Sequence, residues 1–187
     1  MTRSFSAISA AVADELHAVM KRVDEHEVQG LLDRLLAAQR VVLVGVGREG
    51  LTARGFAMRL AHAGIDAHWV WDDTTPPVGD GDLVVAVSGS GRIPHIEAVM
   101  SNARDAGAAT VVVTAAPDGV TAAAADARVF VPATAYLASG DLVKSIQPMG
   151  SLFEQSTFVL FDSLILMLMD ERELNFSDLA ARHRNIE

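Results

Sequence analysis

The residues best suited to chemistry begin in a short loop of serine and glycine. The apolar residues 84–87 are typical of a buried strand, and the loop that follows consists of Ser88, Gly89, Ser90 and Gly91. Small residues let the backbone turn sharply and point its N–H groups inward. Pro94 suits the first turn of a helix, whose amino end carries partial positive charge. These features predict a pocket for a phosphate ester, and the alternative is an ordinary Gly/Ser loop.

A second glycine-rich segment follows an earlier predicted strand. Residues 45–50 read Gly-Val-Gly-Arg-Glu-Gly, the G-x-G-x-x-G pattern of dinucleotide-binding folds. Asp72 stands near the distance expected for a ribose-binding acid. The chain is too short to add a conventional second catalytic domain, so this interpretation yields a bare nicotinamide-binding module. A dinucleotide site explains the first glycine-rich loop only, whereas a phosphosugar pocket at the carboxyl ends of the strands uses both.

The third candidate is Glu154, in a predicted helix that Pro148 opens. One interpretation is an acid favourably placed near a helix amino end. The other is a general base for aldose–ketose isomerisation, which moves a proton between adjacent carbons through an enediol. Such a reaction needs one carboxylate of suitable basicity and an acid to serve the oxygens. It needs neither a metal nor a redox cofactor, so we expect the protein to use none.

The histidines give no metal-ligand pattern. His17, His26, His62 and His68 lie on predicted helices or strands without metal-binding spacing, so we interpret them as surface or structural residues. His183 is different because it lies in the polar tail Arg-His-Arg-Asn-Ile-Glu that closes the chain. A solvated terminus is the simpler interpretation of that tail.

The elements that must position these residues alternate along the chain. The predicted strands are residues 40–46, 66–71, 83–87, 109–114 and 128–131, and the predicted helices between them are 51–63, 93–106 and 119–125. Strands alternating with helices indicate a parallel sheet covered on both faces.

Helical segments flank this alternating region. Residues 5–38 have apolar residues at helical spacing, with Gly30 between two runs. Residues 132–147 have no period and are predicted to be a long loop. A long helix runs from Pro148 to about residue 172, and the tail 177–187 is short and polar, with helix as one prediction for it.

Composition limits the function classes. The 187 residues make about one domain, and half of them are hydrophobic. The formal net charge of −9 argues against a nucleic-acid partner, because phosphate backbones require basic surfaces. There is no cysteine, so disulfides and thiolate sites are excluded. No signal-peptide core is present, and the longest apolar stretch, 158–169, is interrupted by Asp162 and is too short for a membrane span. We therefore expect a cytoplasmic protein with no membrane partner.

With these motifs in place, the chain resembles the sugar isomerase (SIS) domain family, and within it the 6-phospho-3-hexuloisomerases. The resemblance covers nearly the whole chain in order. It rests on the segments 44–50, 56–60 and 88–91, on Pro-Met-Gly-Ser-Leu-Phe-Glu at 148–154 followed by Asp-Ser-Leu at 162–164, and on the ending at 182–187. The late segments are the more specific, because other SIS proteins diverge there.

The resemblance implies a fold and an activity. The expected fold is α/β, a three-layer αβα sandwich with a five-stranded parallel sheet, formed by residues 1–187 as a single SIS domain. The implied reaction interconverts 3-hexulose 6-phosphate and fructose 6-phosphate in formaldehyde fixation by the ribulose monophosphate pathway, after a hexulose-phosphate synthase. The expected assembly is a homotetramer with shared active sites, or else a dimer.

The resemblance also assigns residues. It makes Glu154 the base, and it brings His183 into a neighbouring subunit's site to assist ring opening or proton transfer. The expected contacts with substrate and phosphate come from Gly47, Arg48, Ser88, Gly89, Ser90, Gly91 and Arg92.

Two positions depart from the family pattern. The serine loop usually continues Glu-Thr, and the threonine hydroxyl helps to hold phosphate; here Arg92 and Ile93 stand in those places. Arg92 can replace the lost ligand by a bidentate contact, or it can point to solvent. Glu49 stands where the first loop usually has serine. A carboxylate near a phosphate dianion is unfavourable unless Arg48 or Arg92 neutralises it.

These departures leave rival functions open. The alternative most similar to the implied activity is an isomerase that acts on another sugar phosphate. A phosphosugar sensor without activity comes from another class; the altered phosphate loop favours it, and the presence of Glu154 and His183 argues against it. A nicotinamide-binding module is the third interpretation.

Overall fold

The computed structural model describes residues 3–186 and contains one five-stranded sheet. The strand order is β2-β1-β3-β4-β5, and every neighbouring pair is parallel. The strands are β1 (Val41–Val44), β2 (Ala67–Trp69), β3 (Leu83–Val87), β4 (Ala109–Thr114) and β5 (Ala127–Phe130). The helices are α1 (Phe5–Met20), α2 (Glu25–Ala37), α3 (Gly47–His62), α4 (Pro94–Asp105), α5 (Val120–Ala124), α6 (Ser151–Glu171) and α7 (Phe176–Ala181).

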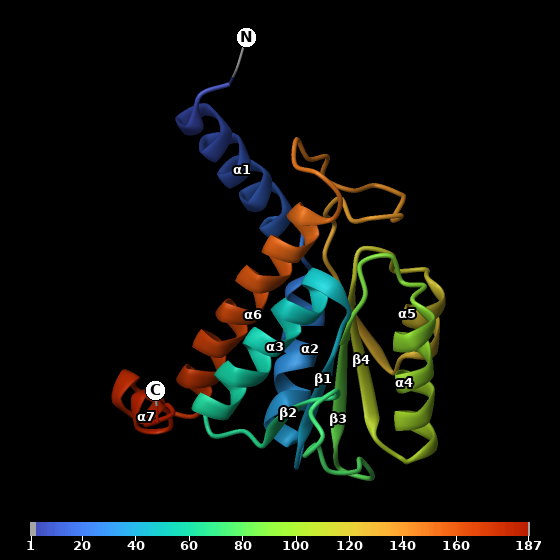
Figure 1. Ribbon diagram of the computed structural model, residues 1–187, viewed down its shortest axis with the longest axis vertical. Helices are drawn as coiled ribbons and strands as arrows, with labels where there is room; N and C mark the ends of the chain where they lie inside the picture. Colours follow the sequence, from blue (N-terminus) through green and yellow to red (C-terminus); the bar gives the residue numbers. More distant parts are fainter. Residues whose placement is uncertain (1–2, 187) are drawn as a thin grey trace.

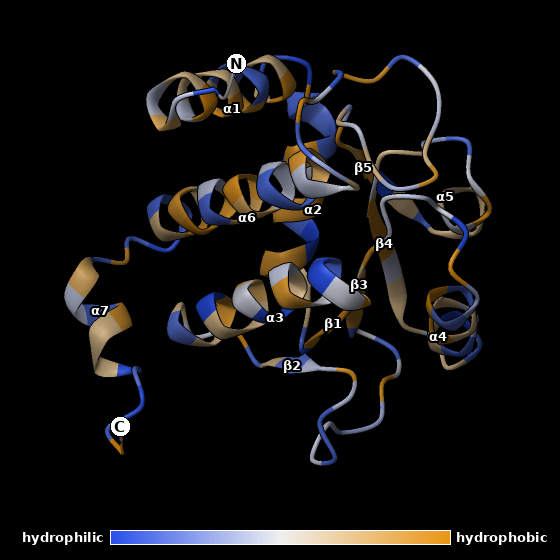
Figure 2. Cartoon of the chain, turned by 45° about the horizontal axis from the view of Figure 1, so that its top comes forward, coloured by the Kyte–Doolittle hydropathy of each residue, from blue (hydrophilic) through white to orange (hydrophobic). Residues whose placement is uncertain are grey.

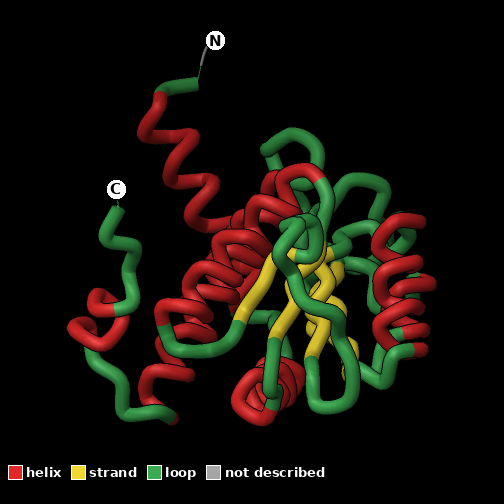
Figure 3. Tube along the Cα trace, turned by 60° about the horizontal axis from the view of Figure 1, so that its bottom comes forward, coloured by secondary structure: helices red, strands yellow, loops and turns green. Residues whose placement is uncertain are grey.

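Helices cover both faces of the sheet, as Figures 1 and 3 show. Alternate residues of a strand point to opposite faces, so Val41 and Leu43 pack with α2, α3 and α6 while Val42 and Val44 pack with α4. All four of these side chains are buried, as expected for a strand in the middle of a parallel sheet. The predicted three-layer α/β sandwich with five parallel strands is confirmed.

Apolar and polar residues alternate along the helices, as the colouring in Figure 2 shows. Helix α6 is the most apolar of them. Among the described residues, it alone has the length and composition of a membrane-spanning helix, and half of its apolar window is buried inside the fold. It therefore serves this structure as a central core helix.

The helical region predicted for residues 5–38 is two helices, which corrects the sequence-based prediction. The break comes at residues 21–24 and not at Gly30, because the Asp24 side chain caps a new helix by accepting from the His26 N–H at 2.8 Å. Gly30 lies inside α2.

Two further helix starts differ from the prediction. Helix α3 begins at Gly47, four residues earlier than expected, because the chain turns from strand to helix within Gly45 and Val46. Helix α6 begins at Ser151 and not at Pro148, since Met149 adopts a positive φ of 58° that a helix does not allow. Both changes bring the site residues Arg48 and Glu154 into the first turns of their helices.

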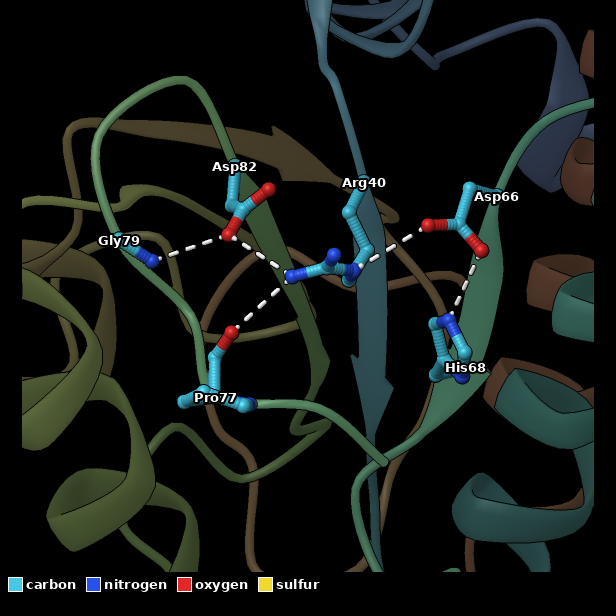
Figure 4. A network of polar contacts seen from close by, with 6 residues as sticks. All are labelled: Arg40, Asp66, His68, Pro77, Gly79 and Asp82. Atoms are coloured by element: carbon cyan, nitrogen blue, oxygen red, sulfur yellow. Dashed lines mark hydrogen bonds and ion pairs between the residues drawn. The ribbon is translucent and has the colours of Figure 1, made fainter. Parts of the chain in front are cut away.

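Arg40 fixes the edge of the sheet opposite the glycine-rich loops (Figure 4). Its guanidinium contacts the Asp66 carboxylate at 3.2 Å and the Asp82 carboxylate at 3.5 Å, and it donates to the Pro77 carbonyl at 3.0 Å. Asp66 and Asp82 immediately precede β2 and β3, so one side chain ties the starts of three neighbouring strands together.

Candidate active site

The two glycine-rich loops lie side by side at the carboxyl ends of β1 and β3. These strands are paired, with Val44 opposite Ala86, and each leads directly into a loop and then a helix. Open parallel sheets bind ligands at this edge. The structure therefore brings together the two loops that the sequence singled out.

The glycines of the first loop have a packing role that needs no dinucleotide. A Cβ on Gly50 would lie 2.9 Å from the Gly45 carbonyl oxygen, and one on Gly45 would lie 3.0 Å from the Gly50 backbone. The start of α3 thus packs directly on the end of β1, and only glycine fits. Gly47, at a φ of +57°, begins the helix and is exposed.

An ion pair joins the first turns of α3 and α6. The Arg48 Nε lies 2.5 Å from the Glu154 Oε2, and the Glu154 side chain is only 14% exposed. The partial positive charge at the amino end of α6 adds to the stabilisation of this carboxylate. Arg48 and Glu154 line an open cavity of about 290 Å³ together with Leu51, Thr52, Gln155 and Phe158.

Packing between the two helices sets this pairing. The rings of Phe56 on α3 and Phe161 on α6 stack at a centroid distance of 4.0 Å. The loop before α6 is also held, because the Glu15 carboxylate of α1 accepts from the Ile146 N–H at 2.7 Å and from the Ser145 hydroxyl at 2.6 Å. Burial opposes ionisation of Glu15, yet these hydrogen bonds lower its pKa overall. No local sequence signal indicates this long-range network.

The serine loop is a tight turn closed by backbone hydrogen bonds. The Gly91 N–H donates to the Ser88 carbonyl at 3.1 Å, and Gly91 has a φ of +64°. The Ser88 side chain is fully buried, and its Oγ has no hydrogen-bond partner among the described residues. Ser90 is partly exposed, so of the two serines its hydroxyl is the one at the surface.

Glu49 reaches from α3 into this loop. Its Oε1 accepts a hydrogen bond from the Gly89 N–H at 3.0 Å, and its Oε2 is buried without a hydrogen-bond partner in the described chain. A Cβ on Gly89 would lie 2.7 Å from that Oε1, so the approach requires glycine. Burial raises the pKa of Glu49 to about 7; the Gly89 N–H opposes the rise and the Glu154 carboxylate adds to it.

Arg92 lies at the surface and contacts a neighbouring loop. Its Nη2 donates to the Leu137 carbonyl at 2.6 Å. It lines a cavity of about 410 Å³ together with Ser90, Gly91, Asp118 and Ser139, among others. The guanidinium therefore borders the serine loop while it donates its hydrogen bond to the 132–147 loop.

His183 lies far from Glu154 within one chain. Its ring lies 5.1 Å from the ring of His62 at the carboxyl end of α3, and its Nδ1 is 3.0 Å from the Arg184 carbonyl. Arg48 and Glu154 lie at the amino ends of α3 and α6, which at 16 and 21 residues are about 24 and 32 Å long. The structure brings Arg48, Glu49, Glu154 and the serine loop together, and it does not bring His183 to them.

Comparison with known proteins gives one family. The SIS domain family profile matches residues 34–158, about two thirds of the chain. That range contains both glycine-rich loops and Glu154.

Relatives named 3-hexulose-6-phosphate isomerase align with nearly the whole chain. It is 35% identical to the 3-hexulose-6-phosphate isomerase of Bacillus subtilis, with 95% of this chain and 96% of that protein aligned. It is 38% identical to the 3-hexulose-6-phosphate isomerase of Mycobacterium gastri, over 94% and 88% of the two chains.

A solved structure agrees with these relatives. A Methanococcus jannaschii protein, whose crystal structure was interpreted as that of a 3-hexulose-6-phosphate isomerase, superposes with a TM-score of 0.84. The alignment is 27% identical and covers 96% of this chain and 98% of that one.

Proposed function

Because this chain belongs to the SIS domain family, we propose that it is a phosphosugar isomerase that interconverts 3-hexulose 6-phosphate and fructose 6-phosphate. The single observation that carries the proposal is the Arg48–Glu154 pair, which holds a largely buried carboxylate near Glu49, the side chain that contacts the serine loop. Relatives of that name align over nearly the full chain, including this region. The reaction belongs to formaldehyde fixation, and a cytoplasmic location follows from its soluble sugar-phosphate substrates.

Glu154 acts as the base. In the open-chain substrate its carboxylate removes the proton from C2, and the C2–H electron pair forms the C2=C3 double bond while the C3 carbonyl oxygen takes up a proton. The product of this step is a 2,3-enediol. The O2 hydroxyl then loses its proton as Glu154 returns the first proton to C3, which leaves a carbonyl at C2. Atoms and electrons balance without an oxidant or a reductant.

Arg48 orients this base. The guanidinium in contact with Glu154 holds the carboxylate in position, and both residues line the same cavity. Charge that develops on the substrate oxygens during enediol formation lies near the same guanidinium. Arg48 therefore both positions Glu154 and stabilises the transition state.

The serine loop holds the phosphate. Ser90 offers a hydroxyl, and the loop between β3 and α4 offers backbone N–H groups at a helix amino end. Ser88, as a buried hydroxyl without a partner, requires a small rearrangement of the loop to join them.

The acid that serves the substrate oxygens comes from another subunit. His183 lies at the opposite end of α3 from Arg48, so a histidine from a neighbouring chain is needed to complete the site. We therefore propose a homo-oligomer with shared active sites, either the homotetramer that the family resemblance implies or a dimer.

An assay of the purified protein with enzymatically generated 3-hexulose 6-phosphate tests this function. We expect fructose 6-phosphate to form, and we expect no reaction of the unphosphorylated sugar. A protein that binds the sugar phosphate without turnover is a sensor, and one that binds only NAD is a dinucleotide module. Either result contradicts the proposal.

A further inference from the structure

The serine loop already holds an anionic group of the chain itself. The Glu49 Oε1 accepts the Gly89 N–H, one of the backbone donors that a bound phosphate requires. The second carboxyl oxygen is buried and unpartnered among the described residues, and so is the Ser88 Oγ. Buried polar atoms usually have partners, so two such atoms beside one loop indicate a site that is complete only when something else binds.

Neither Arg48 nor Arg92 contacts Glu49 in the described structure. On its own helix, the Arg48 Nε is paired with Glu154 at 2.5 Å. On the loop after β3, Arg92 turns away to the Leu137 carbonyl. The charged group that faces Glu49 from α6 is the Glu154 carboxylate, which repels it. The 132–147 loop places the uncharged side chain of Ala135 against Gly89 of the serine loop.

We propose that Glu49 is a specificity-determining residue of the phosphate loop, and that a phosphate ester binds there only together with a proton shared between its oxygen and the Glu49 carboxyl group. The inference rests on the proposed function. A neutral carboxyl group donates its O–H to a phosphate oxygen and so replaces the hydroxyl that serine supplies in related loops.

The electrostatics of the site support this coupling. Burial raises the pKa of Glu49 to about 7 before any ligand is present. A phosphate dianion in contact with the carboxyl group favours its neutral form further. Above pH 7 the empty site holds an ionised Glu49, so binding must take up one proton from solution.

Calorimetric titration with fructose 6-phosphate between pH 7 and 9 tests the inference. In this range the phosphate ester is already a dianion, because its second pKa is about 6. Titrations in two buffers of different ionisation enthalpy give the number of protons taken up. For the wild type we expect uptake that approaches one proton, and a Kd that rises about tenfold for each pH unit above 7.

Two variants isolate the carboxyl group. Glu49→Gln keeps the shape and supplies an amide N–H donor in place of the carboxyl O–H, and Glu49→Ser restores a hydroxyl. Both should bind without proton uptake, with a Kd independent of pH, and about tenfold or more tighter than the wild type at pH 8.5. The matched control is Glu27→Gln, which removes a carboxylate that accepts a backbone N–H, that of Phe130 at 2.6 Å, away from the loop. It should keep the wild-type pH dependence.

Each other outcome overturns the inference. A wild-type Kd that does not change between pH 7 and 9, or a Glu49→Gln variant that retains the slope, removes Glu49 from phosphate binding and leaves the proposed function intact. Fructose 6-phosphate that binds to neither the wild type nor either variant at any pH overturns both proposals.

Discussion

The Nε atom of Arg48 lies 2.5 Å from the Oε2 atom of Glu154, and this contact joins the first turns of two helices that are distant in sequence. Each residue alone has a simple structural interpretation, as a surface arginine and as an acid near a helix amino end. Together they place a fixed carboxylate and a guanidinium on one cavity. A proton acceptor beside a cation is the arrangement that enediol chemistry uses.

Glu154→Gln should abolish isomerisation while the fold is retained. The amide is nearly isosteric but cannot accept the proton, and loss of a general base costs about 10²–10⁴-fold in kcat. Circular dichroism and thermal unfolding verify the fold of the variant. More than half of the wild-type turnover would exclude Glu154 as the base.

Arg48→Met should lower kcat by about 10–100-fold, because the Glu154 carboxylate loses the cation that orients it. Arg48→Lys should recover only part of this loss, since the flexible ammonium group holds the carboxylate in a less fixed geometry than the planar guanidinium does. Steady-state kinetics measure kcat and KM separately. If KM rises and kcat is unchanged, Arg48 contributes to ground-state binding and does not act on the reaction step.

Much of the fold was predictable because buried parallel strands have a strong local signal. The limits of β3 and β4 agree with the prediction to the residue, since β3 is a continuous apolar run and β4 is a run of β-branched residues after Ala109. The helix starts were less predictable. The Asp24 cap and the positive φ of Met149 depend on single residues. The spacing of apolar residues along a helix does not indicate such single-residue features.

The site was predictable in its parts and not in its contacts. The sequence indicated the serine loop, Arg48 and Glu154, and it identified Glu49 and Arg92 as unusual. The contact of Glu49 with Gly89 joins the loop after β1 to the loop after β3, so it depends on the order of strands in the sheet. The Arg92 contact with Leu137 depends on the path of a loop without periodicity, which no local pattern specifies.

Arg92→Ala should raise the KM for the sugar phosphate by no more than about threefold, because an exposed contact contributes little. Its main effect should be on the 132–147 loop, which loses the hydrogen bond at Leu137. Limited proteolysis should therefore cleave this loop faster in the variant. A KM raised more than about tenfold with unchanged proteolysis would instead make Arg92 a phosphate ligand.

Glu49 should make the free energy of unfolding fall as pH rises. Its pKa in the fold, about 7, lies above the ordinary value of 4.5. The folded state therefore binds more protons between these values, so the stabilisation is complete below pH 4.5 and is lost as the pH rises to about 7.

The Glu49→Gln variant checks that sign. The variant has no carboxyl group to titrate at this position, so its stability advantage over the wild type should be larger at pH 8 than at pH 5. The advantage should grow by an amount on the order of 2–3 kcal/mol in the free energy of unfolding, and the difference in Tm should grow with it. Calorimetry of the ligand-free proteins measures both values. An equal difference at both pH values would mean that Glu49 titrates normally in the folded protein.

The last prediction is that two inactive variants restore activity to each other. In one chain His183 lies beside His62 at the carboxyl end of α3, while Glu154 contacts Arg48 at the amino end. If every site takes Glu154 from one subunit and His183 from another, Glu154→Gln and His183→Ala should each be nearly inactive alone. After they are unfolded together and refolded as mixed oligomers in equal amounts, about one quarter of the sites should contain both intact residues.

A mirrored mixture provides the control for this experiment. The wild type refolded with the Glu154→Gln/His183→Ala double variant should fall from about one half to about one quarter of full activity, because intact chains then share sites with damaged ones. Mass spectrometry establishes that mixed oligomers have formed. Suppose that mixed oligomers form, that the two single variants restore no activity to each other, and that the wild type mixed with the double variant stays at one half of full activity. His183 then does not act across subunits, and the acid that serves the substrate oxygens must come from the same chain as Glu154. Glu49 would then be the first residue to examine, because it is the carboxyl group next to Glu154 whose pKa, about 7, lets it give and take a proton near neutral pH.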